Sequence, residues 1–251
     1  MTPISVVIIT YNEENNIGKC IETIKNIADD IVVVDSFSKD KTIKIAESKG
    51  ARVVEHAFDG HIEQKNFAIT QAKFPHILSI DADEFPDQKL LNEIKNVKEN
   101  WVADGYSFNR LNNYCGAWIK HGAWYPDIKL RLWDSRKGEW QGINPHDKFI
   151  MNTDCIEVHL KGNLLHYSYK TIKEHKSKID YFSTIAANAY YINGKRSSLI
   201  KSIVNPLSRF FRDYFFRLGF LDGKYGFIIA LLNSNEVHLK YKKLLQLQKN
   251  Q

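Results

Sequence analysis

The chain has 251 residues, of which 43% are hydrophobic and 25% are charged, a composition typical of a soluble globular protein with one large α/β domain and additions. Its net charge of +6 is uneven, because residues 195–251 carry 11 Lys and Arg against 3 Asp and Glu, whereas residues 1–194 carry 24 against 26. The three cysteines lack any metal-ligand or CxxC spacing, and no apolar run approaches the about 20 residues of a membrane-spanning helix, so a disulfide framework, a zinc site and a spanning protein are not expected.

The first 80 residues alternate between strand and helix patterns. The segment 4–10 is β-branched almost throughout and does not alternate, which is typical of a strand buried on both faces. Further strands are expected at 31–34, 51–54 and 76–80, and helices between them at 15–26, 42–49 and 62–73. Such alternation predicts a mainly parallel sheet covered by helices, whose ligands bind at the carboxyl ends of the strands.

Beyond about residue 103 the pattern changes to short strands rich in aromatic residues, at 106–108, 117–119 and 130–133. We interpret them as the second half of the same domain, with antiparallel pieces and long loops. One domain is therefore expected over 1–170, with halves 1–103 and 104–170. The remaining residues, 171–251, are expected to form a basic helical extension.

That extension is expected to hold a helix at 172–191 and an amphipathic run at 199–220, which Pro206 should kink or restart. Two interpretations of its apolar stripe stay open. The stripe can pack on the domain expected over 1–170, or it can lie on an anionic membrane, held there by basic side chains. Those basic residues are Lys195, Arg196, Lys201, Arg209, Arg212 and Arg217. Nucleic acid is not an expected partner, because no known binding motif accompanies the charge.

Three strand ends deliver polar residues to one edge of the predicted sheet: 10–13 (Thr-Tyr-Asn-Glu), 35–36 (Asp-Ser) and 81–83 (Asp-Ala-Asp). The carboxylates of Asp81 and Asp83, one residue apart, disfavour each other's ionised form, and a divalent metal removes that conflict. Oxygen ligands of this kind suit Mg²⁺ or Mn²⁺. No glycine-rich phosphate loop is present, which disfavours a dinucleotide dehydrogenase and a P-loop NTPase.

Four sequence motifs, in this order, are specific enough to suggest a family: 5–13 (SVVIITYNE), 34–42 (VDSFSKDKT), 64–68 (QKNFA) and 81–84 (DADE). Together they resemble the family 2 inverting glycosyltransferases of GT-A fold. The segments 118–127, 130–133, 144–147 and 220–223 resemble the branch that contains bacterial lipopolysaccharide-core β-1,4-glucosyltransferases. The resemblance implies a Rossmann-like domain with a nucleotide-sugar half (1–103) and an acceptor half (104–170).

The resemblance also implies roles for individual residues on the donor side. Asp83 would bind the metal and Asp81 the metal or the ribose, so that the metal assists departure of the nucleoside diphosphate. The others would surround the donor: Thr10, Tyr11 and Glu13 at base and ribose, Asp35 accepting from the base, Lys65 near base or phosphate, and Arg131 along the diphosphate.

Inversion further requires a base that takes the proton of the acceptor hydroxyl. Asp147 is the first candidate and Asp127 the second. Asp147 stands where related sequences generally carry the Glu of a His-Glu pair, so this chain departs from the family there. Its simpler interpretation is a loop acid paired with His146 or Lys148.

Simpler interpretations also remain for the donor-side residues. Asp35 can act as an N-cap-like residue and Glu13 as a first-turn acid beside a helix dipole. Tyr11 can be a packed aromatic, and Lys65 can be a solvated side chain.

The sequence therefore predicts an enzyme that moves a hexose, with UDP-glucose as the first donor to test, to a lipopolysaccharide-core or lipid-linked sugar. It is expected in the cytoplasm, peripheral at the inner face of the cytoplasmic membrane. The alternative is a non-catalytic scaffold that binds the nucleotide sugar at the membrane surface. A metal phosphohydrolase that uses Asp81 and Asp83 is disfavoured, because the motifs at Tyr11 and Asp35 would then have no role.

Overall fold

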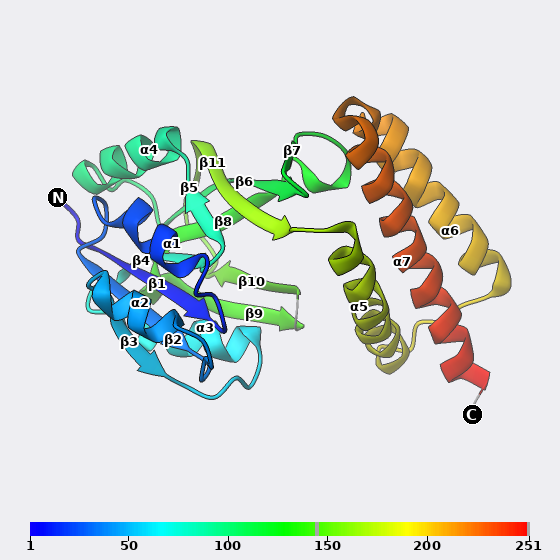
Figure 1. Cartoon of the computed structure of the whole chain (residues 1–251), viewed down its shortest axis with the longest axis horizontal. Coiled ribbons are helices and arrows are strands. Elements are labelled where there is room, and N and C mark those ends of the chain that lie inside the picture. The colour runs from blue at the N-terminus through cyan, green and yellow to red at the C-terminus, as the bar shows by residue number, and fades with distance from the viewer. Residues whose placement is uncertain (144–145, 250–251) are drawn as a thin grey trace. The chain divides into compact units, whose positions relative to one another are not determined.

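The computed structural model describes residues 1–143 and 146–249 and divides into two compact units (Figure 1). Unit 1 comprises Met1–Arg110 and Asp127–His166, and unit 2 comprises Leu111–Pro126 and Tyr167–Gln251. The chain thus crosses from one unit to the other at residues 110, 126 and 166. The domain boundary expected at residue 170 stays a prediction.

The beginning of unit 1 alternates strands and helices, as the sequence predicts. The strands are β1 (Ile4–Thr10), β2 (Asp30–Asp35), β3 (Arg52–Glu55) and β4 (His76–Asp81), and the helices are α1 (Ile17–Ile24), α2 (Thr42–Ser48) and α3 (His61–Thr70). They pair in parallel in the order β3-β2-β1-β4, with Thr10 opposite Asp35 and Ile9 opposite Asp81. The predicted meeting of three strand ends at one edge is therefore confirmed.

The rest of unit 1 makes the sheet mixed. It contributes β5 (Glu84–Pro86), α4 (Gln88–Glu99), β6 (Gly105–Tyr114), β8 (Ile128–Asp134), the turn η2 (Ser135–Lys137) and β11 (Glu157–Tyr169). The order continues β4-β8-β6-β11-β5, and β8 pairs antiparallel with β4. Helix α4 was not expected, although Asp87 is a recognisable N-cap whose side chain accepts from the Leu90 N–H at 2.8 Å.

One face of this sheet is covered by α3 and by the hairpin of β9 (Gly138–Ile143) and β10 (His146–Met151). The indole of Trp133 stacks on Phe149 with ring centroids 4.0 Å apart and is fully buried. The cluster also contains Val7, Val32, Val34, Ala68, Ile77 and Trp140. Trp133 is therefore a core residue. Its packing on Phe149 fixes the hairpin, and β10 of this hairpin carries Asp147.

Unit 2 is helical. It contains α5 (Ile172–Ile192), α6 (Leu199–Phe211) and α7 (Gly223–Lys249), together with β7 (Ala117–Ile119) and the turns η1 (Gly122–Trp124), η3 (Arg212–Phe216) and η4 (Gly219–Asp222). Helices α5 and α6 both pack on α7. Within the described ranges, no helix has the length and apolar character needed to cross a bilayer.

Pro206 does not restart the amphipathic run, because α6 continues through it to Phe211. A proline inside a helix leaves the carbonyl four residues earlier without its usual donor. Here that carbonyl belongs to Ser202, and Nδ1 of His238 on α7 lies 2.8 Å from it. The Ser234 hydroxyl also donates to the Pro206 carbonyl at 2.8 Å. Helix α7 therefore supplies the polar contacts that keep α6 intact.

A buried imidazole in unit 2 makes stability depend on pH. His175 is 3% exposed, stacks on Tyr169 and lies with Nδ1 3.1 Å from the Tyr114 hydroxyl oxygen. Burial, aided by Lys178, lowers its pKa to about 4 against an opposing pull from Glu174. The unfolded chain therefore binds more protons between pH 6.5 and 4, and stability falls as the pH falls through that window.

We expect the free energy of unfolding to drop by about 2 kcal/mol between pH 7 and pH 4.5 on account of His175, after an allowance for screening by solvent. Urea unfolding at the two pH values, compared between the wild type and His175→Gln, measures it. Gln does not titrate, so the variant should lose this part of the pH dependence. An equal pH dependence in both proteins would show that His175 is not responsible.

Candidate active site

A cavity of about 260 Å³ lies at the carboxyl ends of β1 and β4 in unit 1. Five predicted residues line it: Thr10, Tyr11, Glu13, Asp81 and Asp83. The sequence analysis gave no site role to the others, which are Ile9, Ser36, Phe58, His61, Gln64, Ala82 and His166. Asp35, Lys65, Arg131, Asp127 and Asp147 do not line it. The structure thus brings half of the predicted residues into one cavity.

The cavity offers both aromatic and polar groups to a ligand. The side chains of Tyr11 and Phe58 are 56% and 52% exposed, so their rings present flat apolar faces. The Thr10 hydroxyl is buried and has no hydrogen-bond partner among the described residues. Since buried polar groups are normally paired, that hydroxyl is available to a bound molecule.

The loops after β1 and β2 are tied together by side chains. The Asp35 carboxylate is fully buried and accepts from the Ser38 N–H at 2.7 Å and from the Ser38 hydroxyl at 2.6 Å. The Ser38 oxygen in turn accepts from the Asn12 N–H at 2.8 Å. Asp35 therefore fixes the shape of the loop beside the cavity, and its contact with a nucleobase stays a prediction.

Hydrogen bonds also hold Glu13 in place. Its N–H donates to the Thr42 hydroxyl at 2.8 Å, and its carboxylate accepts from the Asn16 side chain at 2.6 Å. The Asp40 carboxylate accepts from the Thr42 N–H at 3.0 Å and from the Glu14 N–H at 3.1 Å. These bonds hold the Glu13 backbone at the rim of the cavity.

Asp81 lies between two cations. Its Oδ1 is 3.7 Å from Lys65 Nζ, and its Oδ2 is 3.3 Å from Arg131 Nη2. Burial raises the pKa of Asp81, but Lys65 and Arg131 outweigh burial and hold that pKa well below its usual range. Asp81 is therefore a carboxylate at neutral pH, and its charge is already balanced within the protein.

Glu84 is the second carboxylate that pairs with Arg131. It belongs to the motif at 81–84, but the sequence predicted no role for it. It is fully buried, and its Oε1 lies 3.1 Å from Arg131 and 3.3 Å from Arg110. Its Oε2 accepts from the Asp81 N–H at 3.1 Å. Glu84 thus fixes the turn that carries Asp81 and Asp83.

Arg131 is 3% exposed, and its pairing explains how its charge is tolerated there. Burial alone would lower its pKa, but Glu84 and Asp81 outweigh burial and raise it. Its Nε and Nη1 have no hydrogen-bond partner among the described residues. Arg131 therefore stabilises the acidic turn, and its predicted contact with a diphosphate is untested.

The two base candidates lie in different surroundings. The Asp127 carboxylate is bound on one oxygen by Arg110, at 2.8 Å, and on the other by Lys129, at 2.9 Å. Burial raises its pKa, but Arg110 and Lys129 outweigh burial and lower it. A carboxylate held in this way is a weak base.

Asp147 lies on β10, where Lys65 donates to its Oδ2 at 2.7 Å. Since Lys65 also pairs with Asp81, the ammonium group links the base candidate to the acidic turn. The Lys65 side chain is 6% exposed and therefore not a solvated surface lysine. Asn144 and Pro145 of the motif at 144–147, and the side chain of His146, one of the two expected partners of Asp147, lie outside the described residues.

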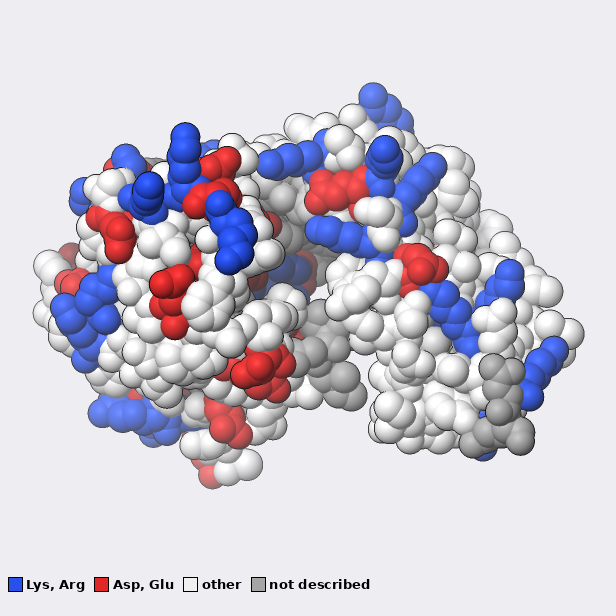
Figure 2. Space-filling model, turned by 60° about the horizontal axis from the view of Figure 1, so that its bottom comes forward, with Lys and Arg blue, Asp and Glu red and all other residues white. Residues whose placement is uncertain are grey.

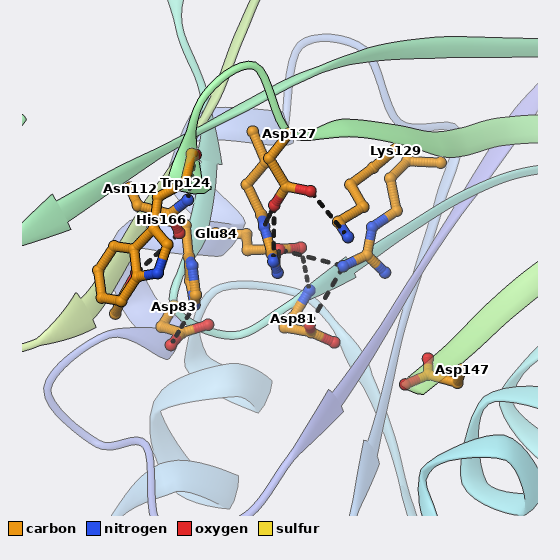
Figure 3. Close-up of polar contacts among 12 residues, drawn as sticks. Asp81, Asp83, Glu84, Asn112, Trp124, Asp127, Lys129, Asp147 and His166 are labelled. Atoms are coloured by element: carbon orange, nitrogen blue, oxygen red, sulfur yellow. Dashed lines mark hydrogen bonds and ion pairs between the residues drawn. The ribbon is translucent and has the colours of Figure 1, made fainter. Parts of the chain in front are cut away.

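His166 stands next to the second aspartate of the motif. Its Nε2 is 3.3 Å from Asp83 Oδ2, because antiparallel pairing of β11 with β5 sets His166 opposite Glu84 (Figure 3). Among the described residues, His, Cys, Asp and Glu side chains form no group of three that could hold a metal. A metal held by Asp83 and His166 would therefore take the rest of its ligands from water and substrate phosphates.

Comparison with known proteins identifies the family of this chain. A family model described as glycosyl transferase family 2 matches residues 5–156. An uncharacterized glycosyltransferase of Rickettsia bellii is 33% identical over 97% of this chain and 86% of its own length. The lipopolysaccharide core biosynthesis glycosyltransferase LpsC of Rhizobium meliloti is 30% identical over 97% of this chain and 92% of its own length.

Among solved structures, S. aureus TarS 1–349 is similar over 100% of this chain and 92% of that chain, with 14% identity and a TM-score of 0.49. The expected fold class, an α/β GT-A-like domain with a mainly parallel sheet and C-terminal helices, is confirmed. The matched range holds the three strand ends, the acidic turn and Asp147, whereas His166 lies beyond it. The chain belongs to glycosyl transferase family 2.

Proposed function

We propose that this protein transfers a hexose, with inversion, from a nucleotide sugar to a lipopolysaccharide-core or lipid-linked sugar. UDP-glucose is the first donor to test. The observation that carries the proposal is the cavity in which Asp81 and Asp83 meet Thr10, Tyr11 and Glu13. A ring for the base, hydroxyl and carboxylate groups for the ribose, and an acidic corner for the diphosphate are the parts that such a donor requires. The likeness to LpsC supports the choice of acceptor.

The acidic corner is suited to an anionic donor only because its charge is compensated. Lys65 and Arg131 balance Asp81, and Arg110 and Arg131 balance Glu84. A diphosphate that approaches this corner meets a nearly neutral group of side chains rather than bare carboxylates. Asp83 then remains, beside His166, as the carboxylate that would bind a metal.

Asp83 and His166 would hold the divalent metal, Mg²⁺ or Mn²⁺. When bound, the metal stabilises the negative charge that develops on the departing nucleoside diphosphate. The protein side chains bind the nucleotide and orient the sugar. Asp147 takes the acceptor proton. Lys65 donates to its Oδ2, so Oδ1 is the oxygen that receives the proton. Both oxygens of Asp127, by contrast, are held by cations.

The metal assignment predicts the outcome of a binding experiment. Mn²⁺ should strengthen the binding of UDP to the wild type by about tenfold or more, which corresponds to about 1.4 kcal/mol. Asp83→Ala should bind UDP equally with and without the metal, because one of the two protein ligands is gone. Isothermal titration calorimetry measures both, with Glu47→Ala, an exposed acid on α2, as the control. Metal-dependent binding that survives in Asp83→Ala would remove Asp83 from the metal site.

The alternative is a non-catalytic protein that binds the nucleotide sugar at a membrane surface. The ion pair of Asp147 with Lys65 favours it, because a base that stays paired accepts no proton. Release of UDP from UDP-glucose in the presence of Mn²⁺ separates the two, since a scaffold releases none. A panel of UDP-, GDP- and dTDP-sugars, offered with extracted glycolipid, then identifies the donor.

We further propose that the enzyme works at the cytoplasmic face of a membrane, where a lipid-linked acceptor is presented.

A further inference from the structure

Helix α6 packs on α7 and leaves most of its apolar side exposed. The residues that it buries are Ser202 and Pro206. The residues of its outer face are between 49% and 74% exposed: Leu199, Ile200, Ile203, Val204, Leu207 and Phe211. A helix of a globular protein normally does the opposite and buries its apolar stripe. Within unit 2 most of this stripe is therefore left uncovered, and its packing on unit 1 stays a prediction.

The exposed apolar residues continue into the turns after α6. Phe216 is 83% exposed, and its exposed neighbours are Phe215, Leu218, Phe220 and Leu221. We call these residues and the outer face of α6 together the apolar surface. Surfaces of this extent on soluble proteins mark sites of interaction with a partner or a membrane.

The turns that carry part of this surface are fixed in place. The Asp222 carboxylate accepts from the His121 N–H at 2.8 Å and lies 3.0 Å from His121 Nδ1. Gly226 on α7 meets the turn so closely that a Cβ at that position would lie 1.8 Å from the Gly219 carbonyl oxygen. The exposed aromatic side chains therefore project from a packed framework.

Basic side chains accompany the apolar surface. Unit 2 carries 16 Lys and Arg against 5 Asp and Glu, whereas unit 1 carries 19 against 24. Figure 2 shows blue side chains among broad white areas on the helical part of the molecule, at its right. Arg209 and Arg212 both bind the buried Asp213, which orients them at the end of α6. The other basic residues close in sequence are Lys195, Arg196, Lys201, Arg217 and Lys224.

We propose that the apolar surface is a membrane-binding surface, on which α6 lies in the plane of an anionic bilayer with its outer face among the lipid chains. An apolar face combined with basic residues is the chemistry that such an interface requires. The 13 residues of α6 span about 20 Å, too short to cross the about 30 Å hydrocarbon core. Lys201, Arg212 and Arg217 contact the lipid phosphates.

Charge decides against a second copy of the chain as the occupant. A two-fold interface places the same surface of both copies face to face. The basic residues of one copy would then lie against those of the other, without enough acidic residues nearby to balance them. Anionic lipid headgroups supply that balance.

This inference deepens the location proposed above, and its test needs neither donor nor acceptor, so its failure is separate from failure of the transferase proposal. The full chain is sedimented with vesicles of phosphatidylcholine alone and of phosphatidylcholine with phosphatidylglycerol. We expect binding to the anionic vesicles, weakened by salt. Ile200→Asp/Ile203→Asp should reduce it by about tenfold or more.

The matched control is Val102→Asp/Ile156→Asp. These two residues lie in unit 1 and are 65% and 60% exposed, compared with 73% and 59% for Ile200 and Ile203. The control adds the same charge at similar exposure and should bind the vesicles as the wild type does. Circular dichroism checks that both variants are folded.

A second variant, Lys201→Gln/Arg217→Gln, should weaken binding to anionic vesicles and leave the apolar surface intact. Wild-type protein that ignores anionic vesicles, or an Ile200→Asp/Ile203→Asp variant that binds them normally, overturns the proposal. Light scattering tests the other occupant, a second copy of the chain. If the wild type is a dimer that does not bind lipid, and Ile200→Asp/Ile203→Asp is a monomer, the membrane proposal is overturned and the surface is a dimer interface.

Discussion

Replacing Asp147 with Asn is expected to lower the turnover of the donor by about 100-fold or more, the effect of removing a general base. The affinity for UDP should stay within about threefold of the wild type, because Asp147 does not line the cavity. Lys65 keeps its second partner, Asp81, at 3.7 Å, so its charge stays balanced in the variant. Nucleotide release and titration calorimetry measure the two quantities.

Three further variants separate the base from its neighbours. Asp127→Asn should have a small effect, since Arg110 and Lys129 already occupy that carboxylate. Asp147→Glu, which restores the residue that related sequences generally carry, should retain activity. If Lys65→Gln reproduces the loss seen in Asp147→Asn, Asp147 positions Lys65 and is not the base. A large loss in Asp127→Asn with normal turnover in Asp147→Asn would transfer the role to Asp127.

Replacing Glu84 with Ala is expected to reduce the free energy of unfolding by about 3–5 kcal/mol. Glu84 is fully buried and is the shared partner of Arg110 and Arg131. Without it, Arg131 is a buried cation whose remaining carboxylate is Asp81, at 3.3 Å. The Asp81 N–H also loses its acceptor. Urea unfolding monitored by circular dichroism measures the change.

The matched control is Glu22→Ala, which breaks an exposed ion pair with Lys49 at 2.9 Å. Exposed pairs contribute little, so this variant should unfold almost as the wild type does. Glu84→Gln, which keeps an acceptor for the Asp81 N–H, should lie between Glu84→Ala and the wild type. Equal stability of Glu84→Ala and the wild type would show that the buried network does not hold the acidic turn.

The sequence predicts the parallel part of the fold because its signals are local. The β-branched runs that end at Thr10, Asp35 and Asp81 identify buried strands, and parallel pairing then brings their ends together. The positions of His166 and Arg131 depend instead on strands that pair across more than 40 residues of chain. No local pattern specifies that register, so the neighbour of Asp83 could not be predicted.

The orientation of α6 could not be predicted for a different reason. Periodicity identifies an apolar stripe but does not show what the stripe faces. The polar bonds from His238 and Ser234 that attach α6 to α7 involve backbone carbonyls, which carry no sequence signature.

The segment Leu111–Pro126 shows that the helical unit is more than a C-terminal extension. It belongs to unit 2, yet it precedes β8 and β10, which carry Arg131 and Asp147. Tyr114 and Ile119 from this segment share a buried cluster with Ile229 of α7. A chain shortened to residue 170 would lack Ile229 and would expose the apolar side chains of Tyr114 and Ile119. The helical unit is therefore interleaved with unit 1 along the chain, and loss of α7 would uncover residues that precede β8.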